Sequence, residues 1–343
     1  MTFEKTVIHA MSMPYAVGTL GSGPGRSVVC ATEDHGPVVR ISPPWRGAQP
    51  FLPGPGGCMA LLADPERNGE MYAVMGCFLG YKFQGGGIYW TRAAPNGEST
   101  AVRVLDLPFA HRIGIARRGA ARYLLAANLA ADKKDAADWS RPGGVYAAVL
   151  DGNAGTPLEP HTVLTGVHRN HGFLVTSLDG AQTLLIGAAE GLIAIDLALA
   201  GEEWRSRPVL GRETSEVAVF DVDGDGRDEL ITIEPFHGNT LRAYRRQGDA
   251  WEPFWDAELE YGHCVLAGMF QGRRSVIVSN RAGSRDLLLF QFGGDAADPR
   301  RLVVDHGAGA ANMLVLESAG GDRLFAANQA AGEIAMYSAR PTA

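Results

Sequence analysis

Cysteine, strong net charge and long apolar runs are all scarce in this sequence. Only four cysteines occur among 343 residues, at positions 30, 58, 77 and 264, and none shows the paired spacing of a metal site. Three of them lie in or at the start of apolar runs, so we expect buried free thiols in a reducing, cytoplasmic compartment. No segment reaches the roughly 18 apolar residues that a membrane helix requires, and residues 1–18 lack the pattern of a secretory signal. We therefore expect no membrane partner.

The charge balance and the missing motifs argue against further classes of protein. The 31 basic and 38 acidic side chains give a net charge of −7, and no basic stripe is present to neutralise phosphates. A nucleic-acid partner is therefore not expected. The sequence also contains no glycine-rich phosphate loop, no serine elbow and no CxxC pair. These absences disfavour nucleotide binding and a serine hydrolase.

What the sequence does contain is a weak structural repeat. Each unit has two apolar strand-like segments, then a third of the form G-x-I/L/V-x-x-Y and a final strand often opened by Trp or Pro. Seven such third strands occur, at residues 36–42, 86–92, 143–149, 191–197, 239–245, 285–291 and 332–338. Dividing 343 residues by seven units leaves 49 residues for each, which suits a four-stranded blade with short loops. The sequence therefore predicts an all-β, seven-bladed β-propeller that forms one domain over residues 1–343.

The two ends of the chain predict how the ring closes. The last unit stops after its third strand, near Met336 and Tyr337, with little chain left. The N-terminal segment EKTVIHA resembles the fourth strands of other units, such as residues 301–307. We therefore expect residues 4–9 to supply the outer strand of the last blade, which removes an exposed sheet edge.

An acidic segment between two apolar runs carries the clearest motif. Residues 221–229 read DVDGDGRDE, which places oxygen ligands at alternating positions and glycines in a tight turn, as a hard cation such as calcium requires. An EF-hand would need Glu at its twelfth position, where Thr232 stands, and helices on both sides. The flanking runs 217–220 and 230–234 instead have the composition of strands. A metal-free acidic turn is the alternative interpretation.

The segment VFDVDGDGRDELIT around this loop resembles an FG-GAP (VCBS) propeller repeat of the integrin type. The resemblance implies that Ca²⁺ or Mg²⁺ is bound by Asp221, Asp223, Asp225 and Glu229, together with the backbone carbonyl of Arg227. Only one of the seven units carries the full loop. It joins the first and second strands of its unit, at the end that we expect to be opposite the pocket, so a structural ion is expected rather than a catalytic one.

Ligand-type side chains open the first strands of four consecutive units. These side chains are His111, His171, Glu216 and His263. In a propeller the first strand lines the axial channel, so we expect the four side chains to meet at one end of it. Three imidazoles and a carboxylate match the ligands of Zn²⁺ or another divalent transition metal with an open coordination position. A polar channel without a metal is the alternative.

Further polar residues follow the second strands and are expected to open on the same end of the channel. A pocket needs such convergent groups, and they include Glu33, Asp34, His35, Lys82, Lys133, Lys134, Glu190, His237, Arg281 and Gln329. The loop at residues 129–142 is much longer than a usual hairpin connection. Loops of this length are typical of lids and binding loops.

Residues 221–238, from the acidic loop through Glu234-Pro235-Phe236-His237-Gly238, also resemble the propeller lyases typified by aldos-2-ulose dehydratase. This resemblance implies a metal-dependent lyase (dehydratase) or isomerase that acts on a keto-sugar or a related carbohydrate. Such an elimination needs a polarised carbonyl, a base and an acid. Our hypothesis assigns the ion to His111, His171 and His263. His237 or Glu216 would be the base, and Lys133 or Tyr81 would assist the leaving group.

Two other functional classes stay open. FG-GAP propellers commonly hold ligands or protein partners without catalysis, so a non-catalytic binding module is the main alternative. A metal-independent hydrolase or a lactonase is the third class. Propeller lactonases hold an axial calcium through Asn, Asp and Glu, whereas this column is rich in histidine. We therefore favour an enzyme whose partner is a small-molecule carbohydrate.

Overall fold

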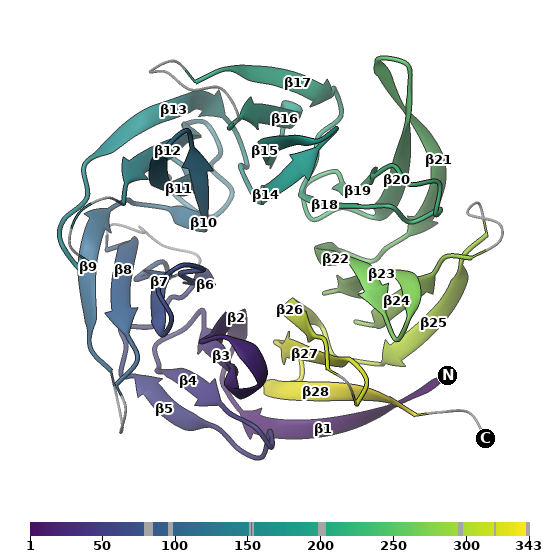
Figure 1. The fold of residues 1–343 in the computed structure, drawn as a ribbon, viewed down its shortest axis with the longest axis horizontal. Coiled ribbons are helices and arrows are strands. Elements are labelled where there is room, and N and C mark those ends of the chain that lie inside the picture. Colours follow the sequence, from purple (N-terminus) through teal and green to yellow (C-terminus); the bar gives the residue numbers. More distant parts are fainter. Residues whose placement is uncertain are drawn as a thin grey trace.

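The computed structural model describes residues 1–78, 85–94, 99–150, 152, 154–197, 204–293, 298–318 and 320–340. Its strands form seven antiparallel sheets of four strands each, arranged around a central axis (Figure 1). The predicted fold class, an all-β propeller with seven four-stranded blades, is confirmed. The one helix in the described ranges is the three-residue 3-10 turn Gly23–Gly25, so this part of the chain contains no candidate for a membrane-spanning helix.

The blades follow one another along the chain. Blade one comprises β2 (Pro14–Leu20), β3 (Ser27–Thr32), β4 (Val38–Ile41) and β5 (Gln49–Leu52), and blade two comprises β6 (Ala60–Ala63), β7 (Glu70–Met75), β8 (Gly87–Arg92) and β9 (Ala101–Asp106). Blade three comprises β10 (Ala110–Arg118), β11 (Ala121–Ala130), β12 (Pro142–Val149) and β13 (Pro160–Val167), and blade four comprises β14 (Gly172–Leu178), β15 (Ala181–Ala188), β16 (Gly191–Asp196) and β17 (Ser206–Leu210). Blade five comprises β18 (Glu216–Phe220), β19 (Glu229–Glu234), β20 (Thr240–Gln247) and β21 (Ala250–Glu258). Blade six comprises β22 (Gly262–Phe270), β23 (Arg273–Asn280), β24 (Leu287–Gln291) and β25 (Arg300–Asp305), and blade seven comprises β26 (Ala310–Leu316), β27 (Arg323–Asn328), β28 (Glu333–Arg340) and β1 (Thr2–Ala10).

The second strands of the blades are the most deeply buried. Every residue of β3, β7 and β19 is buried, because each blade packs between two neighbours and these strands bury side chains on both faces. Apolar side chains therefore gather between adjacent blades, as where Ile231 of blade five and Val276 of blade six share one cluster. The four cysteines are buried free thiols, as predicted.

The first strands of the blades surround the axis. Each of them contacts the first strand of the next blade, from β2 and β6 round to β22 and β26, and β26 in turn contacts β2. The inner strands form a closed ring (Figure 1). The residues that begin them, from Pro14 to Ala310, are therefore brought to one end of the axis although they are far apart in the sequence.

The N-terminal strand closes the ring. β1 pairs antiparallel with β28, and the last sheet has the order β1-β28-β27-β26. Its observed span, Thr2–Ala10, contains the predicted residues 4–9, so the predicted closure is confirmed. Phe3 stacks on Phe270 of blade six at 6.4 Å between ring centroids, and Ile8 is buried in the apolar cluster between blades seven and one.

Removing residues 1–10 is expected to destabilise the ring. β28 would lose its strand partner and present an unpaired edge, which favours association with other chains. We expect a lower thermal midpoint by calorimetry and a shift to larger species by size-exclusion chromatography. The control variant Glu4→Ala, which removes only the exposed ion pair with Arg340, is expected to behave as the intact protein. A truncated protein that stays monomeric with an unchanged midpoint would contradict this role of β1.

Candidate metal centre on the propeller axis

β-Bulges turn side chains toward the axis at the start of several inner strands. β2, β10 and β22 each shift register around their second residue, which is Tyr15, His111 and His263 respectively. A bulge adds an unpaired residue and re-aims its side chain. In blade four, His171 immediately precedes β14, and its N–H donates to the Gly187 carbonyl at 3.1 Å. The strand openings thus gather imidazole and phenol groups at one end of the propeller.

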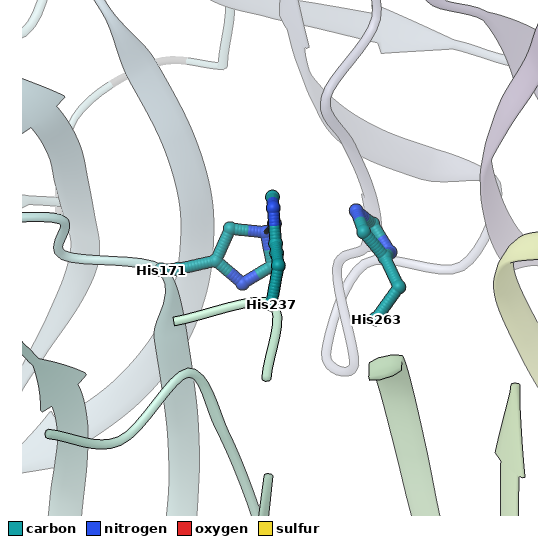
Figure 2. Close-up of side chains that lie close together, drawn as sticks. All are labelled: His171, His237 and His263. Atoms are coloured by element: carbon teal, nitrogen blue, oxygen red, sulfur yellow. Dashed lines mark hydrogen bonds between the residues drawn. The ribbon is translucent and has the colours of Figure 1, made fainter. Parts of the chain in front are cut away.

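Three histidines from blades four, five and six meet at this end (Figure 2). One ring nitrogen from each of His171, His237 and His263 lies within 4.8 Å of the others. The Nε2 atoms of His171 and His237 are 3.3 Å apart. Two tetrahedral ligands about 2.0 Å from a zinc ion are separated by roughly this distance. His171 and His237 therefore have the spacing of two ligands of one ion, and a nitrogen of His263 lies within 4.8 Å of both.

The other nitrogen of each ring already has a hydrogen-bond partner. Nδ1 of His171 lies 2.7 Å from a carboxylate oxygen of Glu216, and Nδ1 of His263 lies 2.7 Å from the Ala311 carbonyl. The carboxylate and the carbonyl can only accept, so they fix the tautomers of His171 and His263 with the proton on Nδ1 and a lone pair on Nε2. Nδ1 of His237 lies 2.8 Å from the hydroxyl of Tyr261, which can donate or accept. Where that hydroxyl accepts, the Nε2 lone pairs of His171 and His237 face each other at 3.3 Å and need a proton or a cation between them.

The environment keeps these imidazoles neutral. Burial is the main cause that lowers the pKa values of His171, His237 and His263, and the positive charge of Arg112 lowers each of them further. The Arg281 guanidinium acts in the same direction on His237 and His263. Neutral imidazole is the form that binds a metal, so the histidines are in their ligand state at pH 7.

The carboxylate of Glu216 forms an ion pair with an arginine. Arg112 donates to Glu216 at 2.9 Å, and both side chains are largely buried. Although burial acts to raise the pKa of Glu216, Arg112 and then His171 hold that pKa below its usual value. Arg112 also donates to the Met59 carbonyl at 3.3 Å. This arrangement favours an orienting role for Glu216, toward His171, over the ligand and base roles in our hypothesis.

His111 belongs to the same group of rings but has a different partner. Its ring lies 4.4 Å from that of His171 between centroids. Its Nε2 is 3.1 Å from the hydroxyl of Tyr15, which also lies 3.5 Å from Nε2 of His263. His111 is not part of the three-nitrogen group, whose third member is His237. The loop residue His237 stands in this group where the prediction had His111, and binding of an ion by His111 stays a prediction.

The long loop of blade three reaches over this cluster. Phe236 stacks on His237 at 4.0 Å between centroids, and Trp139 packs edge-on against Phe236 at 5.3 Å. Nζ of Lys133 lies 3.4 Å above the Trp139 ring and donates to the Ala136 carbonyl. The rings of Trp139 and Phe236 therefore lie between Lys133 and His237. Its predicted contact with a leaving group stays a prediction.

The remaining site residues divide into those outside the described ranges and those that the sequence did not reveal. Tyr81 and Lys82 lie outside the described residues. Tyr15, Arg112 and Tyr261 were not predicted. Tyr15 occupies the same bulged second position of its strand as His111 and His263, but the sequence pattern took Pro14 as the residue that opens this strand. Arg112 could be found only through its partner Glu216, which is 104 positions away.

The acidic loop lies at the other end of blade five. It joins β18 to β19, whose paired residues Phe220 and Glu229 mark the end away from Glu216. Carboxylate oxygens of Asp221, Asp223 and Asp225 lie within 4.8 Å of one another. The expected position of this loop, opposite the axial site, is thus borne out by the strand register, whereas the ion itself stays a prediction.

The surroundings of the acidic loop fit a cation. Glu229 is buried, and one of its oxygens accepts from the backbone N–H groups of Val222 and Asp223. Burial first, and then the charges of Asp223 and Asp225, raise the pKa of Glu229 to about 7. Part of the acidic charge is already balanced by arginine, since Arg245 lies 2.7 Å from Asp223. A divalent ion would balance the rest.

Comparisons with known proteins support the fold alone. No protein-family model matches the chain, and no curated protein matches it in sequence. The gluconolactonase XC5397 from Xanthomonas campestris is 12% identical, with 97% of this chain and 89% of that chain covered and a TM-score of 0.51. A candidate 6-phosphogluconolactonase from Bacteroides uniformis is 14% identical, with 92% and 88% covered and a TM-score of 0.52. The β-propeller domain of Cps50 (Swd1) from Myceliophteria thermophila is 13% identical, with 98% and 100% covered and a TM-score of 0.61.

Calcium is expected to stabilise the protein through the acidic loop. Addition of calcium to protein treated with chelator should raise the thermal midpoint, because binding to the folded state alone shifts the unfolding equilibrium. The variant Asp223→Ala should lose this shift. Asp228→Asn is the matched control, since Asp228 is exposed in the same loop and outside the expected ligand set. Equal calcium shifts in both variants and the native protein would contradict the site.

The raised pKa of Glu229 predicts a pH-dependent stability in chelator. A carboxyl that keeps its proton longer in the folded state stabilises it at low pH, and this contribution is lost as pH rises from about 4.5 to about 7. Glu229→Gln cannot lose a proton. We therefore expect its thermal midpoint, relative to the native protein, to increase between pH 5 and pH 8. A difference that is constant over this range would refute the assignment.

Proposed function

We propose that this protein is a metal-dependent lyase or isomerase that acts on a keto-sugar or a related carbohydrate at the axial histidines. The observation that carries the proposal is the approach of three ring nitrogens within 4.8 Å, from His171, His237 and His263, each ring having a hydrogen-bond partner at its Nδ1. Three neutral imidazoles that leave a fourth position open are the ligand set of catalytic zinc and related ions.

The proposed chemistry follows from the residues around this position. A divalent cation held there would polarise the substrate carbonyl and so acidify the neighbouring C–H group. Glu216 would hold His171 in the ligand tautomer, and Arg112 would keep Glu216 ionised. Phe236 and Trp139 would shield the site from water on the side of blades three and five. In this scheme His237 binds the cation, so His237 is not the base that removes the proton.

The carbohydrate class has two supports of different kinds. The segment at residues 221–238 resembles the propeller lyases that act on keto-sugars. Among the structural neighbours, the Xanthomonas protein is named a gluconolactonase and the Bacteroides protein a candidate 6-phosphogluconolactonase. At 12% and 14% identity this likeness establishes the fold alone, so the names are the weaker support for a carbohydrate substrate and none for the reaction. The lyase or isomerase assignment rests on the resemblance together with the histidine geometry.

Elemental analysis of untagged protein tests the metal. We expect one transition-metal ion per chain that is absent from His171→Ala, because loss of a ligand opens the site. His306→Ala is the matched control, since the side chain of His306 is 77% exposed and lies outside the cluster. It should retain the ion. Elimination or isomerisation of a panel of keto-sugars should then be detected with the metal-loaded native protein and not with His171→Ala.

The opposite result would change the functional class. If the native protein holds no transition metal, or holds the same amount as His171→Ala, the axial cluster is not a metal centre. Absence of turnover together with calcium as the sole bound ion would favour the non-catalytic binding module instead.

A further inference from the structure

Three loops from blades six, seven and one bring polar residues to the same end of the axis as the histidines. Arg281 follows β23, Gln329 follows β27 and Glu33 follows β3. The last residue of each of these strands pairs with the first residue of the inner strand of its blade. The loops therefore leave their blades where the inner strands begin, which is the end that holds the metal cluster.

Two of these residues are buried without satisfying their polar atoms. Glu33 is 5% exposed and Gln329 is 8% exposed. Oε2 of Glu33 and Nε2 of Gln329 have no hydrogen-bond partner among the described residues. Buried polar atoms in folded proteins are nearly always paired, and leaving one unpaired costs about 1–3 kcal/mol. Gln329 acts on Glu33 as a hydrogen-bonding neighbour, yet these two atoms lie outside direct hydrogen-bond geometry, so a polar ligand between them would complete both.

Electrostatic coupling locates this pair beside the site. Burial raises the pKa of Glu33, while Arg281 and Gln329 act to lower it, so all three groups lie near one another. The charges of Glu33 and Arg281 also act on Tyr15, the phenol that lies between His111 and His263. Arg281 forms no ion pair with the described residues. Its positive charge favours the ionised, acceptor form of Glu33 and so opposes the effect of burial.

We propose that Glu33 and Gln329 form a subsite for the hydroxyl groups of the substrate, on the side of the axis formed by blades one and seven. One sugar hydroxyl would donate to Oε2 of Glu33, and a neighbouring hydroxyl would accept from Nε2 of Gln329. A carboxylate beside an amide N–H is a pairing suited to a vicinal diol, because it offers one acceptor and one donor. The polyhydroxylated tail of a keto-sugar is the chemical class that fits.

This inference rests on the proposed function, since it assumes that the carbonyl of the same sugar faces the histidines in blades four to six. It adds the part of the site that distinguishes a sugar from a small ketone. A site built to hydrogen-bond hydroxyls rejects an analogue that lacks them, because its own buried polar groups are then left unpaired.

Calorimetric titration tests the subsite with three probes. D-Fructose and 2-keto-D-gluconate carry a polyol tail, whereas hydroxyacetone offers the same hydroxyketone without it. We expect at least one keto-sugar to bind the native protein ten times more tightly than hydroxyacetone, or better. Glu33→Gln keeps the shape of the side chain and is expected to bring this ratio below about threefold, as is Gln329→Leu. Gln291→Leu, which alters an equally buried glutamine of blade six, should keep the native ratio.

Two results would overturn the subsite. One is a native protein that binds neither keto-sugar more tightly than hydroxyacetone. The other is a native ratio retained by both Glu33→Gln and Gln329→Leu. Metal analysis of the native protein, with His171→Ala as its reference, separates this inference from the proposed function. If the native protein prefers a keto-sugar to hydroxyacetone but contains no metal, only the metal centre is refuted. If it contains the metal but shows no such preference, only the subsite is refuted.

Discussion

The buried carboxylate of Glu216 is the contact on which the axial site depends. It belongs to blade five, receives a hydrogen bond from Arg112 of blade three and faces Nδ1 of His171 in blade four. Arg112 in turn reaches the Met59 carbonyl of blade two. One charge pair thus ties four blades together at the mouth of the channel. Breaking such a pair by removing one partner costs about 3–5 kcal/mol, because the other charge stays buried.

The propeller architecture explains why the axial histidines and the acidic loop lie at opposite ends of the blades. The closed ring fixes where every inner strand begins, and bulges at those positions direct Tyr15, His111 and His263 to the channel. The loops that follow the second strands, such as the one bearing His237, return over the same end. The acidic loop at residues 221–229 joins the opposite ends of β18 and β19. The two candidate ion sites are therefore separated by the length of a blade strand.

The fold could be predicted because its signal is repeated seven times, so irregular units did not hide the pattern. The closing strand followed from the missing fourth strand of the last unit. The site was harder to predict for physical reasons that differ between residues. Tyr15 was missed because the sequence pattern began its strand at Pro14, and His237 reaches the axis on a loop whose path strand periodicity does not encode. Its φ of 46° is a conformation that few residues other than glycine adopt. Arg112 required knowledge of its distant partner, whereas His171 and His263 were found because each begins an apolar run in the sequence.

The central claim is that His171, His237 and His263 bind one cation through Nε2, and anomalous diffraction from crystals of the zinc-loaded protein tests it most directly. We predict a single zinc peak on the propeller axis, about 2.0–2.1 Å from each of these three nitrogens, with Glu216 still in contact with Nδ1 of His171. A map without a peak on the axis would contradict the claim, as would a zinc ion held by His111 in place of His237.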